Sequence, residues 1–171
     1  MESELSPGDE QKKQAMITAL RSLAAGDKSE NDLLQKLKQK GFGEASITAT
    51  LDQLKREGLL SDEVYAEKLA RRILQDKRGG AHKLAFELKK RRVPEAIRKT
   101  VLDAIDPAQQ RQQALEIAEL KLSSFKNSSG RVLAKKLYDF LMRKGYDFQL
   151  AQDVARIVAM KSGRHLDHEN S

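Results

Sequence analysis

The chain has 171 residues, with 32 lysines and arginines against 25 aspartates and glutamates, so its formal net charge is +7. The absence of cysteine excludes a disulfide framework, cysteine-ligated metal sites and a thiol nucleophile, and it suits a reducing cytosol. No apolar run approaches the roughly 18 residues of a membrane span, and no signal peptide is recognisable, so we expect a cytoplasmic protein that binds no membrane. The basic balance favours an acidic partner such as nucleic acid.

Abundant helix-forming residues and only three prolines predict helix along almost the whole chain. The first helix covers residues 13–25, where the apolar residues recur at helical spacing. The expected core residues of this helix are Met16, Ile17, Leu20, Leu23 and Ala24. The capping-box pair Ser29 and Asp32 predicts the start of a second helix, which ends at Gly41. A third begins near Gly43 and runs to about Gly58.

The same three-helix pattern then recurs twice. Residues 61–78 form the next expected helix, with Val64, Leu69 and Ile73 along one face, and Gly79-Gly80 breaks it. Helices over 81–93 and from Pro94 to about 105 complete the second round. The third round begins at Asp106-Pro107, a cap followed by a first-turn proline, and continues through helices that end near Phe125, Gly145 and Ser162.

Superposing the ends of the middle helices makes the repeat explicit. The matching triplets are Lys40-Gly41-Phe42, Arg91-Arg92-Val93 and Lys144-Gly145-Tyr146, and they lie 51 and 53 residues apart. We therefore predict an all-α fold of three tandem three-helix modules over 11–60, 61–105 and 106–162, in an elongated or curved arrangement. Polar residues 1–10 and 163–171 are expected to be disordered.

Catalytic chemistry finds little support in the sequence. His82 stands alone after the glycine break, and His165 and His168 have no third metal ligand at a suitable spacing. Gly41-Phe42-Gly43 joins two helices and lacks a following Gly-Lys-Ser/Thr, so it is a turn and not a phosphate loop. The prediction is a non-enzyme with no catalytic residue, cofactor or metal.

The positive charge is concentrated in the second module. Residues 1–60 have a net charge of −1, residues 61–105 have +5 and residues 106–171 have +3. The candidate partner-binding residues of the second module, called the central set, are Arg71, Arg72, Lys77, Arg78, Lys83, Lys89, Lys90, Arg91 and Arg92. These cations could instead be solubilising faces paired with nearby carboxylates. Gly79-Gly80 would let the next helix present its N-terminus closely to a phosphate or carboxylate.

Sequence-specific DNA reading is not indicated. Aromatic residues make up 5% of the chain, and most of the four candidates for base stacking fall on apolar stripes, where core packing is the default. These candidates are Tyr65, Phe86, Tyr138 and Tyr146. A helix-turn-helix could be built from any triplet, but nothing marks one helix as a recognition helix.

Three segments of the repeats form a recognisable series. They are Ser29-Glu30-x2-Leu33-x2-Lys36-Leu37-x2-Lys40-Gly41-Phe42, then Gly58-Leu59-Leu60-Ser61-Asp62-x2-Tyr65-Ala66, and Arg143-Lys144-Gly145-Tyr146 in the third repeat. In their order and spacing they resemble the signature of the bacterial RecX family of regulatory proteins. The similarity covers roughly residues 13–162. One segment departs from it, because Arg78-Gly79-Gly80-Ala81 stands where the family usually has a Gly-Tyr-Gly-Pro-like element.

The resemblance implies a non-catalytic modulator of the recombinase RecA that lies in the groove of the RecA filament on single-stranded DNA. Such a protein suppresses ATP hydrolysis, strand exchange and coprotease activity, binds single-stranded DNA directly or through RecA, and is expected to be a monomer. We expect the central set to face the filament with a C-terminal set of Arg131, Lys135, Lys136, Arg143 and Lys144. A helical nucleic-acid-binding protein that acts without RecA, or an interaction scaffold for another protein, remains an alternative.

Overall fold

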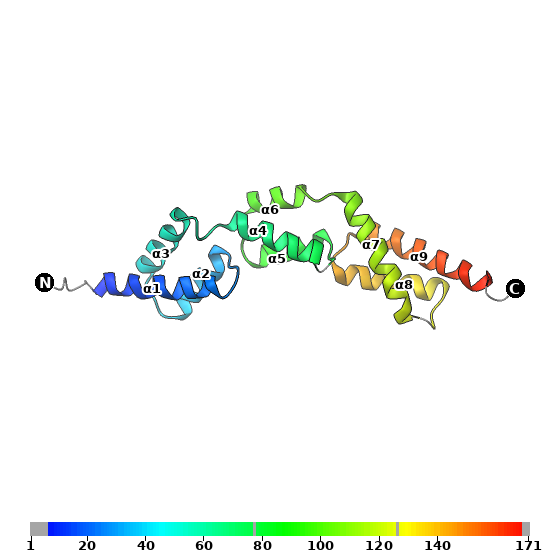
Figure 1. The fold of residues 1–171 in the computed structure, drawn as a ribbon, viewed down its shortest axis with the longest axis horizontal. Helices are drawn as coiled ribbons and strands as arrows, with labels where there is room; N and C mark the ends of the chain where they lie inside the picture. The colour runs from blue at the N-terminus through cyan, green and yellow to red at the C-terminus, as the bar shows by residue number, and fades with distance from the viewer. Residues whose placement is uncertain (1–6, 77, 126, 169–171) are drawn as a thin grey trace. The chain divides into compact units, whose positions relative to one another are not determined.

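The structure is a computed structural model that describes residues 7–76, 78–125 and 127–168, with side chains described as far as Gly163. Its elements in chain order are α1 Pro7–Ala24, α2 Glu30–Gln39, α3 Glu44–Arg56, α4 Asp62–Ala70, the π-helical η1 Arg71–Asp76, α5 Ala81–Lys90, α6 Glu95–Asp103, α7 Pro107–Lys121, the 3-10 turn η2 Leu122–Phe125, α8 Gly130–Lys144 and α9 Phe148–His168 (Figure 1). These described segments contain no strand, so the all-α prediction is confirmed. None of the helices in the described ranges is long and apolar enough to span a membrane.

The described residues form two compact units. Unit 1 contains the chain up to Lys68 together with Leu88–Arg98, and unit 2 contains Leu69–Glu87 together with the chain from Lys99 onward. The first repeat, α1–α3, belongs wholly to unit 1 and the third, α7–α9, wholly to unit 2. The middle repeat is shared, because each of its three helical segments contributes residues to both units.

Helix starts follow the capping signals of the sequence. The Ser29 side chain accepts a hydrogen bond from the backbone N–H of Asp32, whose carboxylate accepts the N–H of Ser29, which completes the predicted capping box. Asp106 caps α7 by accepting from the N–H of Ala108, and Pro107 occupies the first turn. Each cap satisfies a backbone donor that the helix leaves unpaired.

The three middle helices end in the same way, as the repeat predicts. A residue with left-handed backbone geometry follows each helix within two positions, with φ of 82° at Gly41, 54° at Arg92 and 85° at Gly145. The next N–H then donates back across the last turn to a leucine carbonyl, in the pairs Phe42 to Leu37 (3.3 Å), Val93 to Leu88 (3.1 Å) and Tyr146 to Leu141 (3.2 Å). This pattern is a Schellman-type C-cap, which glycine adopts without steric cost. The superposition of the three repeats is therefore confirmed at the level of backbone geometry.

The first helix of each outer repeat uses alanine where it meets its core. Ala15 and Ala19 of α1 are fully buried, whereas Leu20 is 42% exposed, so the predicted stripe is displaced by about one residue. Ala114 and Ala118 occupy the same place in α7. Small side chains allow close helix packing, and the larger residues then lie at the flanks, where the sequence pattern counted them as core.

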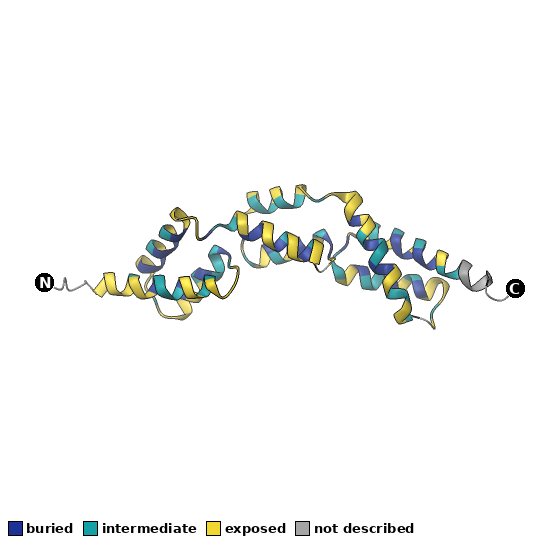
Figure 2. Cartoon of the chain, viewed as in Figure 1, coloured by how far each residue is buried: buried dark blue, intermediate teal, exposed yellow. Residues whose placement is uncertain are grey.

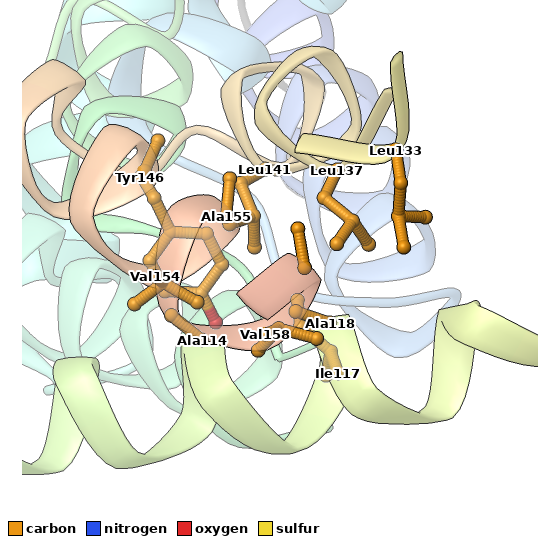
Figure 3. Packing of buried hydrophobic residues seen from close by; sticks show 12 residues of the cluster. Ala114, Ile117, Ala118, Leu133, Leu137, Leu141, Tyr146, Val154, Ala155 and Val158 are labelled. Atoms are coloured by element: carbon orange, nitrogen blue, oxygen red, sulfur yellow. The ribbon is translucent and has the colours of Figure 1, made fainter. Parts of the chain in front are cut away.

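Each unit has its own cluster of buried side chains (Figure 2). In unit 2, leucines of α8 face valines and alanines of α9 and the alanines of α7, and Tyr146 is buried among them (Figure 3). Tyr65 is also buried, which confirms core packing for these two aromatic residues. Val64 was predicted to be core but is 50% exposed, because neighbouring Tyr65 and Ala66 take the buried positions of α4.

The helical segments extend further than the sequence pattern predicts at both ends. Helix α1 begins at Pro7, where a first-turn proline and the acidic Asp9 and Glu10 suit a helix N-terminus. Helix α9 continues through Gly163 to His168, since no proline or second glycine interrupts it. Residues 7–10 and 163–168 are therefore helical, and residues 1–6 and 169–171 lie outside the described part of the chain.

In unit 1, the end of α5 packs on the start of α2. The Ser29 hydroxyl donates to the backbone carbonyl of Arg91 at 3.2 Å, and the N–H of Glu30 donates to the Asp62 carboxylate at 2.8 Å. The Arg91 guanidinium is 2.9 Å from Asp32. Backbone groups and a salt bridge thus join the middle helices of repeats 1 and 2.

Unit 2 contains the corresponding junction between repeats 2 and 3. The N–H groups of Gly80 and His82 donate to the carbonyls of Lys144 (2.9 Å) and Gly145 (3.0 Å) at the end of α8. The N–H of Ala81 donates to Gln110 of α7 at 3.2 Å, as that of Glu30 does to Asp62 in unit 1. In both units, backbone carbonyls at the C-terminal end of one middle helix therefore accept hydrogen bonds from the N-terminal end of the preceding one, from a side-chain hydroxyl in unit 1 and from backbone N–H groups in unit 2.

Candidate partner-binding surface

The backbone junction in unit 2 overturns one sequence-based expectation. The first backbone donors of α5 were predicted to be available to a phosphate or carboxylate, but Gly80, Ala81 and His82 all donate to protein acceptors. A Cβ on Gly80 would lie 2.1 Å from the carbonyl oxygen of Gly145, so the glycine serves close backbone packing. The start of α5 is thus a structural contact and not an anion site.

His82 and Lys83 lie beside this contact. The imidazole of His82 is 3.7 Å from the Asp147 carboxylate, and both side chains are largely exposed. Lys83 packs its backbone and Cβ close to Gly145, while its ammonium makes no ion pair with the residues that the structure describes. The backbone of Lys83 is therefore occupied by the contact with Gly145, and its side chain is available to a partner.

In unit 1 the central set contributes the four cations that end α5. Lys89, Lys90 and Arg92 are exposed, and none of the three forms an ion pair within the described chain. Arg91 differs, because Asp32 fixes its guanidinium and Ser29 binds its carbonyl. Arg91 thus has a structural role at the junction, whereas its three neighbours project freely.

Arg92 has an unusual backbone conformation. Its φ of 54° is left-handed, at the position where the other two repeats have glycine. A side chain there costs of the order of 1 kcal/mol or more. The structure gives Arg92 no ion pair among the described residues that would offset this cost.

In unit 2, Arg71 and Arg72 begin the π-helical segment η1. Both side chains are exposed and have no carboxylate partner among the residues described. The sequence predicts a regular helix over 61–78, but the structure widens it at Arg71–Asp76, and Gly79 donates to the carbonyl of Ile73 at 2.8 Å. Widened turns of this kind occur frequently at functional sites.

The backbone of Arg78 is held in place by a hydrogen bond to its carbonyl. Its φ is 46°, and its carbonyl accepts a hydrogen bond from the hydroxyl of Tyr146 at 2.9 Å. Burial raises the pKa of Tyr146 to about 12, with nearby Arg78 opposing the increase, so the phenol remains a donor at neutral pH. The guanidinium of Arg78 is 3.9 Å from Glu116, a long and exposed pair.

The C-terminal set lies along α8. Lys135 pairs with Asp139 at 3.1 Å, and Lys136 donates to Ser128 and lies 5.7 Å from the ring centre of Phe125. Lys144 lies over Phe140 at 5.9 Å. Arg131 and Arg143 are exposed and form no ion pair in the described ranges.

The structure thus separates the predicted residues by their contacts. Those with exposed or half-exposed charge and no ion pair, side-chain hydrogen bond or cation–π contact in the described chain, which we call the unpaired cations, are Arg71, Arg72, Lys83, Lys89, Lys90, Arg92, Arg131 and Arg143. Lys77 lies outside the described residues. The unpaired cations do not form one cluster within a unit, because Lys89, Lys90 and Arg92 belong to unit 1 and the others to unit 2.

The first repeat contains a basic groove that the sequence pattern did not predict. Arg21 of α1, Lys28 of the following loop, and Lys36 and Lys40 at α2 line it together. The net charge of −1 for residues 1–60 concealed this cluster. The i, i+4 spacing of Lys36 and Lys40 was the one available signal, because it places both on the same helix face.

The described residues contain no group of three histidine or acidic side chains that could hold a metal ion. The candidate site consists of cations, whose side chains can bind acidic or phosphate groups.

Comparison with known proteins gives consistent similarities. The family model for the first three-helix domain of RecX matches residues 15–54, and the model for the third matches residues 108–154. The regulatory protein RecX of Clostridium botulinum (strain Eklund 17B / Type B) is 31% identical over 140 residues, which are 81% of this chain and 65% of that protein. The chain therefore spans about two thirds of the length of such relatives. RecX of Chlorobium phaeobacteroides (strain BS1) is 31% identical over 139 residues, covering 81% of this chain and 89% of that protein.

Solved structures share the fold. The crystal structure of RecX from Lactobacillus salivarius matches with a TM-score of 0.77 at 18% identity, covering 88% of this chain and 98% of that one. A second crystal structure of regulatory protein RecX matches with a TM-score of 0.76 at 21% identity, covering 90% and 80%. The all-helical fold is therefore common to these proteins.

Proposed function

Because the chain belongs to the RecX family of regulatory proteins, we propose that it regulates the recombinase RecA. It acts as a monomer that lies in the groove of the RecA filament on single-stranded DNA. By occupying that groove it suppresses ATP hydrolysis, strand exchange and coprotease activity. It performs no chemistry of its own.

The observation that supports this proposal is the set of unpaired cations on the middle and third repeats. Uncompensated cations attract a partner whose groove exposes acidic side chains or DNA phosphates, and they increase the association rate. Repeated modules in one chain can also contact successive subunits of a polymer, so that several weak contacts act together.

The test is the ATPase activity of RecA on single-stranded DNA, titrated with this protein. We expect inhibition at protein concentrations well below that of RecA. A variant with Arg71, Arg72, Lys89 and Arg92 replaced by alanine is expected to inhibit at least tenfold less effectively, because each exposed contact to a charged group contributes about 0.5 kcal/mol or more.

A matched control removes the same charge elsewhere. Lys13, Lys38, Arg56 and Arg111 are exposed, lie outside the unpaired cations, and form no ion pair with any described residue. Their fourfold alanine variant should inhibit like the wild type, and both variants should keep the helical circular dichroism spectrum. Wild-type inhibition by the first variant, or equal loss in both, would contradict the assignment of these residues to the filament.

A further inference from the structure

The groove of the first repeat has an almost entirely cationic and polar lining. It has a volume of about 510 Å³ and lies between the C-terminal part of α1 and α2, within unit 1. Its lining residues are Thr18, Arg21, Ser22, Ala25, Lys28, Lys36 and Lys40. Among the described residues, no carboxylate and no large apolar side chain lines it.

The carboxylates near this groove are already engaged elsewhere. Asp27 pairs with Lys68 at 2.8 Å, and Glu30 pairs with Lys55 at 2.9 Å. Asp32 binds both Arg91 and the capped N–H of Ser29. Within the part of the chain that the structure describes, the groove cations therefore have no acidic partner, although the first repeat as a whole contains more acidic than basic residues.

The side chains of the groove cations are largely available. Lys28 donates to the carbonyls of Gly26 and Asp27 in its own loop. Arg21, Lys36 and Lys40 have exposed side chains that make no hydrogen bond or ion pair within the described chain. Cations near helix C-termini gain a few tenths of a kcal/mol from the helix dipole, but this does not require them to converge on one hollow. Like charges brought together repel each other, so their convergence points to an anionic ligand.

We propose that this groove binds the phosphodiester backbone of a nucleic-acid strand directly, without RecA. Three cationic side chains that make no hydrogen bond or ion pair in the described chain match a ligand that presents only acceptor oxygens. An acidic peptide is the other anionic candidate, but it would gain little here, because the groove has no aromatic or large apolar side chain to receive an anchor residue. A second hollow, lined by Ser22, Lys28, Asp32, Gln35, Lys36, Gln39 and Arg91, shares three residues with the groove. A strand could therefore continue beyond one phosphate group.

The test measures binding of the full chain to a fluorescent single-stranded oligo(dT) by anisotropy, at several salt concentrations and with no RecA present. The groove variant replaces Arg21, Lys36 and Lys40 by alanine. Each phosphate contact contributes about 0.7 to the slope of log affinity against log salt for single strands, so three lost contacts should reduce the slope by about 2. The same relation gives a loss of about a hundredfold in affinity at 0.1 M salt.

The matched control is the Lys13, Lys38 and Arg56 triple alanine variant, which removes the same charge from other faces of α1, α2 and α3. It should keep the wild-type salt slope. Equal losses in the two variants would mean that only net charge matters, and an undetectable affinity of the wild type for DNA would also overturn the proposal. A groove variant that binds DNA normally but loses binding to poly-glutamate would assign the groove to an acidic protein instead.

RecA is absent from this assay. If the groove proves not to bind DNA, the proposed function is therefore still decided separately, by the ATPase titration. Conversely, a protein that binds DNA through this groove but does not affect RecA would support the inference and contradict the proposed function.

Discussion

Replacing Gly80 by alanine tests the junction between repeats 2 and 3 in unit 2. The added Cβ would lie 2.1 Å from the carbonyl oxygen of Gly145 and 2.3 Å from both the carbonyl carbon of Gly145 and the nitrogen of Tyr146. All three atoms belong to the backbone, so no side-chain rotation can relieve the contact. Either the start of α5 must withdraw from the end of α8, or the strain must remain.

The loss of stability in Gly80→Ala can be estimated from the contacts that are lost when the start of α5 withdraws from the end of α8. The hydrogen bonds from Gly80 to Lys144 and from His82 to Gly145 would be lost, at about 0.5–1.5 kcal/mol each. Residual overpacking contributes a further cost of about 1–3 kcal/mol if the backbone moves only partly. We therefore expect Gly80→Ala to lower the free energy of unfolding by roughly 2–4 kcal/mol.

Urea denaturation followed by circular dichroism measures this change. With a slope of about 2 kcal/mol per molar urea, the unfolding midpoint should decrease by about 1–2 M. The control is Gly163→Ala in α9, where an added Cβ meets no atom within 4 Å and alanine should raise helix stability by roughly 0.5–1 kcal/mol. If Gly80→Ala leaves the midpoint unchanged, the two helix ends are not in contact and the junction described here is wrong.

Substitutions at two further positions test unit 1. Arg92→Gly should raise the free energy of unfolding by roughly 0.5–1 kcal/mol, because glycine relieves the left-handed strain at φ 54°; a decrease in the urea midpoint would show that the arginine makes a stabilising contact instead. Asp62→Ala should cost about 1 kcal/mol by removing the acceptor for the N–H of Glu30, whereas Asp62→Asn keeps an acceptor oxygen and should match the wild type at pH 7. Burial raises the pKa of Asp62, with the Glu30 hydrogen bond opposing it, so the wild type should gain stability relative to Asp62→Asn as the pH falls through this pKa. Equal losses in the two Asp62 variants, or the opposite trend in denaturation series at pH 7 and pH 4, would contradict this account.

Local signals explain why much of the fold was predictable. The capping box at Ser29, the Asp106-Pro107 start of α7 and the left-handed turn at Gly145 each depend on residues within a few positions of one another. Such interactions are encoded in short segments, so the order of the helices and the period of the repeat could be predicted from the sequence. Even Arg92, which lacks the glycine signal, was identified as the equivalent position by the spacing alone.

The choice of core residues was less predictable. Helical periodicity identifies one apolar face, but it does not say how closely a neighbouring helix approaches. Ala15 and Ala19 became the centre of the α1 contact and Leu20 remained exposed, because small residues allow closer packing than leucine. The same reason applies to Ala114 and Ala118 of α7.

The functional surface depended most on tertiary structure. The order of residues along the chain was enough to show that cations are numerous in the second and third repeats and that the molecule is a repeated helical protein. It did not show that Arg91 is held by Asp32, 59 residues away, or that backbone donors at the start of α5 bind the end of α8; these contacts come from the tertiary fold. The fold also brought Arg21 beside Lys36 and Lys40 in a repeat with a net charge of −1. Charge can be counted along a chain, but whether a cation is paired depends on which residues folding brings within a few ångströms of it.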